Sequence, residues 1–327
     1  MRQRLTSLCR SIAIGAVILG LQLNCLSSPL IKKPIRLIVP FPAGGATDIM
    51  ARGIAMGLAN ELEQTVVVEN KGGAGGAIAA EYVAHSTPDG TTLLFATMGV
   101  MSINPSLYPK LKYDPLKDFT PISLTHLTPR VLVVNSALPV KSVAELIAYA
   151  LKKPGQLTYG SSGNGSSSHL SGALFENLAK VDLLHIPYKG SSLLLTDLIS
   201  ARVDMAFDAY AVYEEHIKSG KLRLLAITSK KRMPWLPNIP TLSESGLPNY
   251  EVANWLGVVA PSGLPSETAK GINTALIKVM GNPSLKQQLF DIGIEPTSSS
   301  PEEFTRTIQS ESIKWAEIVK KANITLD

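Results

Sequence analysis

Short apolar segments rich in β-branched residues alternate with helical segments along this chain, and that alternation restricts the possible folds more than any other feature. A strand is predicted at 34–40, followed by a turn at 41–46 and by a helix with Thr47 as its N-cap. Strand, turn, helix and strand follow again at 65–97. This order favours right-handed βαβ units, so we expect an α/β protein with mostly parallel sheets.

A second series of strands and helices begins near Val131, and the last part of the chain, from Trp255, adds a strand and three helices. These terminal helices need a sheet to cover, and the first series of strands is their natural partner. We therefore expect two α/β lobes and a chain that crosses between them twice. The predicted bounds are 29–129 with 250–327 for the first lobe and 130–249 for the second.

The first 28 residues have the plan of a secretory signal peptide. Three arginines at 2, 4 and 10 precede an apolar run from Ile12 to Leu23, which is shorter than the roughly 20 residues that span a bilayer. Lipoprotein cleavage at Cys25 is the less favoured alternative, because Asn24 stands where a small residue is expected. The mature protein should therefore be exported from the cytoplasm.

Composition removes several classes of function. Both cysteines, Cys9 and Cys25, lie in or at the edge of the leader, which excludes disulfides, thiolate catalysis and cysteine–zinc sites from the mature chain. The histidines lack metal-binding spacing, and the glycines at 72–76 form neither a dinucleotide nor a phosphate-binding motif, so neither metal nor cofactor is expected. Three of the 31 Lys and Arg residues lie in the leader, so the mature chain has 28 basic and 26 acidic residues. A nearly neutral chain with scattered basic residues is not expected to bind nucleic acid.

Two loops, at 41–48 and 159–169, each lie between a predicted strand and a helix N-terminus. Helix N-termini present free N–H groups and a partial positive charge, which suits anions. Neither loop contains Lys or Arg, so we expect dipoles and hydrogen bonds, rather than an ion pair, to hold an anion there. Asp208 ends a predicted strand, where it could accept a hydrogen bond from a ligand amine or hydroxyl.

A secreted serine hydrolase is the weaker alternative. The hydroxyls at 161–168 could combine with His169, His185 and Asp208 to form a catalytic triad. However, the G-x-S-x-G motif is incomplete, because Asn164 stands in place of its second glycine. The sequence therefore favours a protein that binds a ligand over an enzyme.

Motifs spread over nearly the whole mature chain are similar to those of one family. They are Pro34–Gly45 with Asp48, Val67–Lys71 with the glycines at 72–76, Pro88–Leu93, His185–Gly190, Asp197–Leu198, Val203–Asp204, Gly220–Arg223, and Pro240–Thr241 with Gly246–Pro248. Each motif is short, but together they are specific. The chain resembles the Bug, or tripartite tricarboxylate transporter, substrate-binding receptors.

This resemblance implies a non-enzymatic periplasmic binding protein of type II, with two lobes that close around a small carboxylate, either an organic acid or an amino acid. It implies one large and one small membrane subunit as partners, or a sensor protein if the receptor is an orphan. We expect a monomer. The chain departs from the family at Ala209 and Tyr210, where Asn and a small residue are usual, so no relative's ligand can be transferred to it.

The resemblance also implies which residues bind the ligand. The carboxylate is expected between the loops at 41–48 and 161–167, partly through ordered waters, with Thr97, Tyr188 and Asp208 lining the cleft. The full predicted set is Phe41, Pro42, Ala43, Gly44, Gly45, Thr47, Asp48, Thr97, Ser161, Ser162, Gly163, Asn164, Gly165, Ser167, Tyr188 and Asp208.

Overall fold

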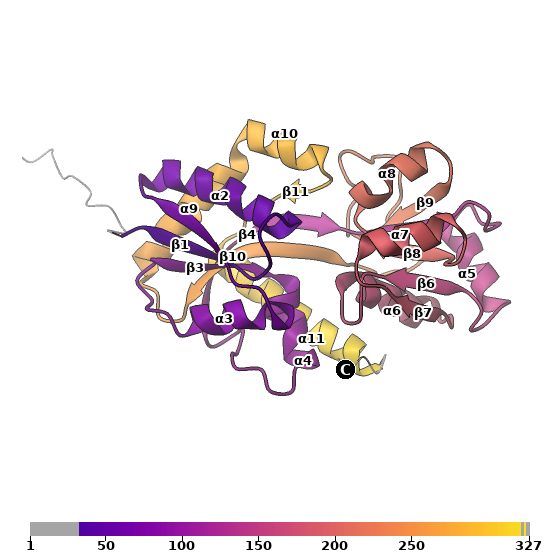
Figure 1. Ribbon diagram of the computed structural model, residues 1–327, viewed down its shortest axis with the longest axis horizontal. Helices are drawn as coiled ribbons and strands as arrows, with labels where there is room; N and C mark the ends of the chain where they lie inside the picture. The colour runs from indigo at the N-terminus through magenta and orange to yellow at the C-terminus, as the bar shows by residue number, and fades with distance from the viewer. Residues whose placement is uncertain (1–32, 322–323, 325–327) are drawn as a thin grey trace, which may run out of the picture.

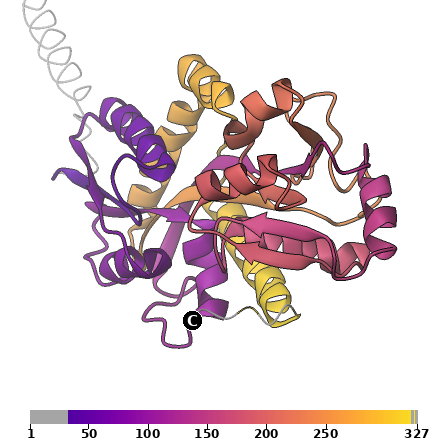
Figure 2. The same cartoon turned by 45° about the vertical axis from the view of Figure 1, so that its right-hand side comes forward.

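The computed structural model describes residues 33–321 and residue 324, and divides them into two lobes (Figure 1). The predicted signal peptide and Cys25 lie outside the described residues. Within the described part of the chain, no helix is both long and apolar enough to cross a membrane. Each lobe has its own sheet, and Figure 2 shows helices packed around both sheets.

The six-stranded lobe combines the N-terminal and C-terminal parts of the described chain. Its sheet has the order β11-β4-β10-β3-β1-β2. Its third strand along the chain is buried at every position, as expected for a strand covered by helices on both faces. The strands are β1 (Ile35–Val39), β2 (Val66–Asn70), β3 (Thr92–Thr97), β4 (Phe119–Pro129), β10 (Ala253–Pro261) and β11 (Glu295–Pro296).

The five-stranded lobe is formed by the middle of the chain. Its sheet has the order β7-β6-β8-β5-β9. The strands are β5 (Val131–Asn135), β6 (Thr158–Ser161), β7 (Leu184–Pro187), β8 (Met205–Asp208) and β9 (Leu222–Ile227). Its helices are α5 (Val143–Leu151), α6 (Ser167–Ala179), α7 (Ser191–Ile199) and α8 (Tyr210–Lys218).

The helices of the six-stranded lobe come from both ends of the described chain. The terminal helices α9 and α11 contact strand β4, which confirms the predicted packing of these helices against the first sheet. They are α2 (Ala46–Leu62), α3 (Ala77–Ala84), α4 (Asn104–Leu107), α9 (Ser266–Gly281), α10 (Pro283–Asp291) and α11 (Pro301–Lys321), with a 3-10 turn at Ala74–Gly76 and a π-helical turn at Gly99–Ile103.

The prediction of mostly parallel sheets is wrong, because both sheets are mixed. β1 pairs in parallel with β2 and β3, and β6 pairs in parallel with β7 and β8. However, β10 runs antiparallel to β3 and β4, and β5 runs antiparallel to β8 and β9. Most of the antiparallel strands lie next to the two crossovers between the lobes. A strand that enters a sheet from the other lobe is not connected to its neighbour by a βαβ unit, so it need not run parallel to it.

The apolar core continues from one lobe into the other. One cluster fills the space between α2, α9 and their face of the six-stranded sheet. A larger cluster covers the opposite face and extends along α11 to α6 in the other lobe, joining Phe304 and Trp315 to Phe175. A third cluster lies under α7 and α8. The lobes therefore share buried apolar surface, which stabilises their association.

The two crossovers between the lobes lie against each other. Arg130 is the single residue between β4 and β5. Its backbone N–H donates to Thr228 Oγ1 at 2.7 Å, and Thr228 N–H donates back to the Arg130 carbonyl at 2.9 Å. Thr228 also accepts from Val252 N–H at 2.8 Å on the return crossover. Arg130 is thus fixed at the junction of the lobes, between one sheet and the other.

Candidate functional site

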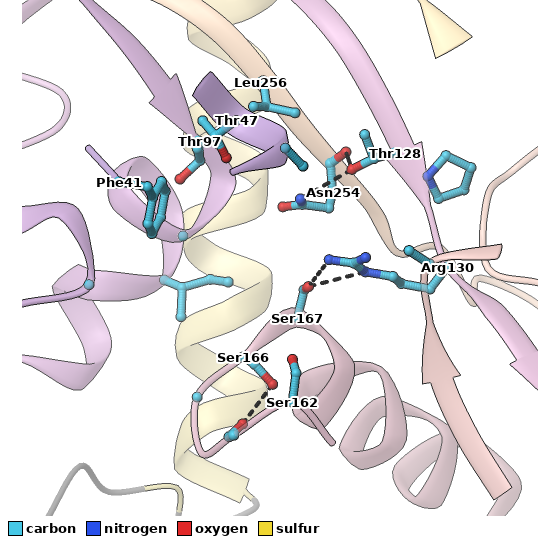
Figure 3. A pocket seen from close by; sticks show the side chains of 18 of the residues that line it. Phe41, Thr47, Thr97, Thr128, Arg130, Ser162, Ser166, Ser167, Asn254 and Leu256 are labelled. Atoms are coloured by element: carbon cyan, nitrogen blue, oxygen red, sulfur yellow. Dashed lines mark hydrogen bonds between the residues drawn. The ribbon is translucent and has the colours of Figure 1, made fainter. Parts of the chain in front are cut away.

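A cavity of about 670 Å³ lies between the two lobes. The six-stranded lobe contributes Phe41, Thr47 and Thr97, while the five-stranded lobe contributes the loop from Ser162 to Ser167. Figure 3 shows these side chains converging on the cavity from opposite sides. The two loops selected from the sequence therefore face one shared space.

The first loop ends where α2 begins. Gly45, rather than the predicted Thr47, is the N-cap of this 17-residue helix. Thr47 therefore lies in the first turn, and its side chain lines the cavity beside Phe41. The N-terminus of a helix as long as α2 presents unpaired backbone N–H groups and the positive end of the helix dipole.

Asp48 fixes the first loop from behind the cavity wall. Asp48 is only 2% exposed. It accepts hydrogen bonds from Gly44 N at 2.9 Å, Arg52 Nε at 2.8 Å and Asn70 Nδ2 at 2.9 Å. The Arg52 bond first, then the Gly44 and Asn70 bonds, lower the pKa of Asp48 from 3.8 to about 2. Asp48 thus remains ionised and holds the turn in place.

The second loop is stabilised by its own hydroxyl groups. Ser166 caps α6: its Oγ accepts from His169 N at 3.3 Å and donates to the Gly163 carbonyl at 2.6 Å. Gly163 adopts a φ of +139°, which glycine tolerates far better than other residues. The helix begins at Ser167, two residues earlier than the sequence predicts, so Ser167 lies at the positive end of α6.

Arg130 brings a positive charge into the cavity wall that the sequence did not predict. Its guanidinium donates from Nε and Nη2 to Ser167 Oγ at 3.2 and 2.7 Å, as Figure 3 shows. Its Nη1 lies 3.4 Å from Asp208 Oδ1. The expectation that an anion would meet only dipoles considered the two loops alone, and it missed this cation because Arg130 belongs to neither loop.

Asp208 contacts Arg130 and is only 3% exposed. Its Oδ2 accepts from Ser191 Oγ at 2.5 Å and lies 3.5 Å from the Tyr213 hydroxyl. Its Oδ1 accepts from Ala209 N at 2.8 Å in addition to Arg130. Asp208 therefore orients Arg130, and its oxygens are already engaged by protein donors.

The predicted residues divide evenly between the cavity wall and its surroundings. Those that line the cavity are Phe41, Thr47, Thr97, Ser162, Gly163, Asn164, Gly165 and Ser167. Those that do not line it are Pro42, Ala43, Gly44, Gly45, Asp48, Ser161, Tyr188 and Asp208. The turn at 42–45 is exposed beside the cavity, and the Tyr188 hydroxyl donates to Asp197 at 2.9 Å instead of turning inward.

Several lining residues were missed by sequence reasoning. Thr128 and Asn254 come from neighbouring strands, β4 and β10, and Asn254 Nδ2 donates to Thr128 Oγ1 at 3.2 Å. Part of the wall is apolar, including Ile103, Leu107 and Ile294. No local pattern marks these residues, whereas a charged residue between two buried strands was a signal that could have identified Arg130.

A stack of three aromatic rings packs beneath the loop at 161–167 and is hydrogen-bonded to it. The rings of His169 and His185 lie 3.8 Å apart and nearly parallel, and Tyr159 stacks on His185 at 4.8 Å. His169 Nδ1 accepts from Gly165 N at 3.1 Å, and His185 Nε2 lies 2.7 Å from Ser161 Oγ. Burial lowers the pKa of both histidines from 6.5 to about 4.

These contacts do not assemble the triad that the hydrolase alternative requires. Ser161 is fully buried. Asp208 bonds to Arg130, Ser191 and Ala209 rather than to either histidine in the described part of the chain. Nucleophile, base and orienting acid thus do not form one connected series.

The buried histidines predict that acid destabilises the fold. An unfolded histidine takes up a proton near pH 6.5, whereas the stacked pair resists protonation down to about pH 4. The free energy of unfolding should therefore fall as pH decreases from 6.5 to 4, by at most about 3 kcal/mol for each ring and by less for the half-buried His185, whose charge solvent partly screens. Urea unfolding across this range measures the slope.

His185→Gln should flatten that slope in part, because it removes one ring of the stack and keeps a polar partner for Ser161. The buried His126, whose pKa is lowered by burial to about 3, contributes equally in both proteins. His85→Gln is the matched control, since His85 is exposed. An unchanged slope in His185→Gln would show that the stack does not cause the acid sensitivity.

Comparison with known proteins gives a consistent result. A family model described as "Tripartite tricarboxylate transporter family receptor" matches residues 50–324. A protein from a Pseudomonas species, described as "UPF0065 protein in tcbD-tcbE intergenic region", is 37% identical over 289 residues, which are 88% of this chain and 86% of that protein.

Solved structures agree over both lobes. The structure of an R. palustris protein with adipate shares 40% sequence identity and a TM-score of 0.76, and the match covers 90% of this chain and 99% of that one. MatC from Rhodopseudomonas palustris, with bound malate, shares 33% identity and a TM-score of 0.71 over 88% and 99% of the two chains. The predicted two-lobed fold of a periplasmic binding protein is thereby confirmed, and the chain belongs to the tripartite tricarboxylate transporter family of receptors.

Proposed function

We propose that this receptor captures a small carboxylate between its two lobes and does not transform it chemically. The ligand lies between the start of α2 on one side and the start of α6 with Arg130 on the other. The adipate and malate in the related structures support this class of ligand. Closure of the lobes excludes water and strengthens each of these interactions.

One observation carries this proposal: two helix N-termini and one guanidinium face a single cavity between the lobes. Ser167 Oγ accepts two hydrogen bonds from Arg130, so its own proton remains to be donated to a ligand oxygen. The backbone N–H groups at the start of α6 lie beside it. Together these donors form a site that complements a carboxylate.

The receptor acts, in this proposal, as a monomer in the periplasm and delivers its ligand to one large and one small membrane subunit of a tripartite tricarboxylate-type transporter. The family match supports this role. Ligand-driven closure supplies the signal, because a ligand favours the closed form by its difference in affinity for the two forms. Co-expression with one large and one small membrane subunit of a transporter of this type, followed by uptake of labelled acid, would test it.

Direct binding tests the central claim. The protein is freed of co-purified ligand by unfolding and refolding, then titrated with adipate, malate and other small acids by calorimetry. Saturable binding of at least one acid at one site per chain is expected. If no carboxylate binds, or if an acid ester is hydrolysed, the proposal is wrong.

Ser167→Ala should weaken binding of the preferred acid about tenfold, because a hydrogen bond to a charged acceptor is worth roughly 1.5 kcal/mol or more. The same titration measures this loss. Ser192→Ala, an exposed serine on α7 outside the cavity, is the control and should bind as the wild type does. Equal affinity in the two variants would remove Ser167 from the site.

A further inference from the structure

The side chains that line the cavity carry formal charge of one sign. Of the residues between 33 and 321 that line it, Arg130 alone carries a side chain that is charged at neutral pH. Lysine, aspartate, glutamate and histidine are absent from that described lining. A ligand in the cavity therefore meets one formal positive charge, and the remaining polar contacts come from hydroxyls, amides and backbone groups.

The two acidic residues nearest to the cavity cannot serve a ligand cation. Asp48 and Asp208 are 2% and 3% exposed. Each accepts from several protein donors: Asp48 from a backbone amide, an arginine and an asparagine, and Asp208 from a backbone amide, Arg130 and a serine. The expectation that Asp208 could accept from a ligand amine thus conflicts with its geometry, because its lone pairs are occupied.

Arg130, in contrast, retains capacity for a ligand. Of its five N–H groups, one on Nε and one on Nη2 contact Ser167, and one on Nη1 faces Asp208. One N–H on each Nη is left without a partner in the described chain. A carboxylate has two oxygens to accept such a pair of donors, and the guanidinium is already held in place by Ser167 and Asp208.

An ammonium group would face the opposite situation. In this cavity it would lose hydration, would find no available carboxylate, and would lie near the positive guanidinium. An unpaired buried charge costs several kcal/mol, and a like charge nearby adds to that cost. The same acid without the amino group avoids both costs.

We propose that Arg130 makes the cavity selective for acids that lack an ammonium group, so that a dicarboxylate binds and the amino-substituted dicarboxylate of equal length does not. This inference rests on the proposed function as a carboxylate receptor. One carboxylate contacts Arg130 and Ser167 at the start of α6, and the second lies towards the start of α2. Specificity then comes from the repulsion between Arg130 and an ammonium group as much as from the attraction between Arg130 and a carboxylate.

Matched ligand pairs test this inference by calorimetry on the ligand-free protein: succinate against aspartate, glutarate against glutamate, and adipate against 2-aminoadipate. In the best-binding pair, the wild type should prefer the acid without an amino group by about 100-fold or more. Equal affinity for both members of that pair would overturn the selectivity while leaving the carboxylate site intact. No binding of any acid would instead overturn the proposed function, and the inference with it.

Variants of Arg130 assign the selectivity to this residue. Arg130→Gln should weaken dicarboxylate binding about 50-fold and reduce the preference within a pair about tenfold, because the like charge is gone while an ammonium group still finds no free carboxylate. Because Arg130→Gln leaves Asp208 buried without its cation, the double variant Arg130→Gln/Asp208→Asn removes both charges, and it should show the same reduced preference.

The matched control is Arg202→Gln, in the same lobe, where Arg202 pairs with Asp197 at 3.0 Å and is 73% exposed. This variant should keep wild-type affinity and preference. Circular dichroism and urea unfolding establish that each variant is folded. If both Arg130 variants fold and retain the wild-type preference, Arg130 does not set the specificity.

Discussion

Replacing Gly257 with valine should lower the free energy of unfolding by about 4 kcal/mol, the largest loss of stability that we expect from a single substitution in this protein. Gly257 lies in β10, where a Cβ atom would come within 2.5 Å of Phe304 Cζ and 2.6 Å of the Ser123 carbonyl oxygen. Phe304 is fully buried and packs edge-on against Trp255, so its ring has little room to move.

The Ser123 contact makes this position especially sensitive. The carbonyl oxygen belongs to β4, which pairs with β10 through two register irregularities around Gly257. Backbone in a paired strand cannot shift without breaking ladder hydrogen bonds, so the clash is not relieved by a change of side-chain rotamer. β10 also carries Asn254 and Leu256 to the cavity, so ligand affinity should fall as well.

Urea unfolding of the ligand-free protein measures the predicted loss at Gly257. The control is Gly281→Ala, at the end of α9, where a Cβ atom would meet nothing within 4 Å. That variant should be as stable as the wild type or slightly more so, because alanine reduces the entropy of the unfolded chain. A stability of Gly257→Val within about 1 kcal/mol of the wild type would contradict the packing argument.

Asp48→Ala is expected to have the second-largest effect, because it acts on both stability and binding. The substitution removes the acceptor of the Gly44 amide, one of the two acceptors of the Asn70 side-chain amide and the ion-pair partner of Arg52. We expect a loss of about 2–3 kcal/mol in unfolding free energy at neutral pH. Ligand affinity should fall about tenfold, because the turn at 41–45 is no longer fixed against α2.

The contribution of Asp48 should depend on pH in a defined direction. Its pKa is lowered from 3.8 in the ordinary side chain to about 2 in the folded protein. The stabilisation is therefore complete above pH 3.8 and is lost as pH falls towards 2. The difference in unfolding free energy between wild type and Asp48→Ala should shrink over the same interval.

Arg52→Gln separates the two roles of the Asp48 cluster. Arg52 is 55% exposed although Asp48 is buried, so solvent screens the arginine's charge and keeps the ion pair's contribution to about 1 kcal/mol. This variant should therefore cost little stability and keep ligand affinity, since the Gly44 and Asn70 bonds persist. A loss in Arg52→Gln as large as that in Asp48→Ala would assign the effect to the ion pair and not to the turn.

The sequence by itself determined the alternation of strands and helices, the two loops at helix starts and the family. These depend on local patterns: apolar spacing defines an element, and serines and glycines define where it begins. Phe41, Thr47 and the residues at 162–165 were found at the cavity because they lie in those loops. The parallel pairing of the strands at 34–97 was predicted correctly. The antiparallel strands were not predicted, since a crossover between lobes is not a local pattern.

Only the tertiary structure decided the electrostatics of the site. Arg130, a lone residue between two strands, lies in the cavity wall. The carboxylate oxygens of Asp48 and Asp208 accept hydrogen bonds from protein donors instead of facing the ligand. A side chain's charge is fixed by its chemistry, but its exposure and partners are set by segments far away in the chain. Arg130 and Ser167 are 37 residues apart in sequence and yet form one donor group, because the two sheets bring them together.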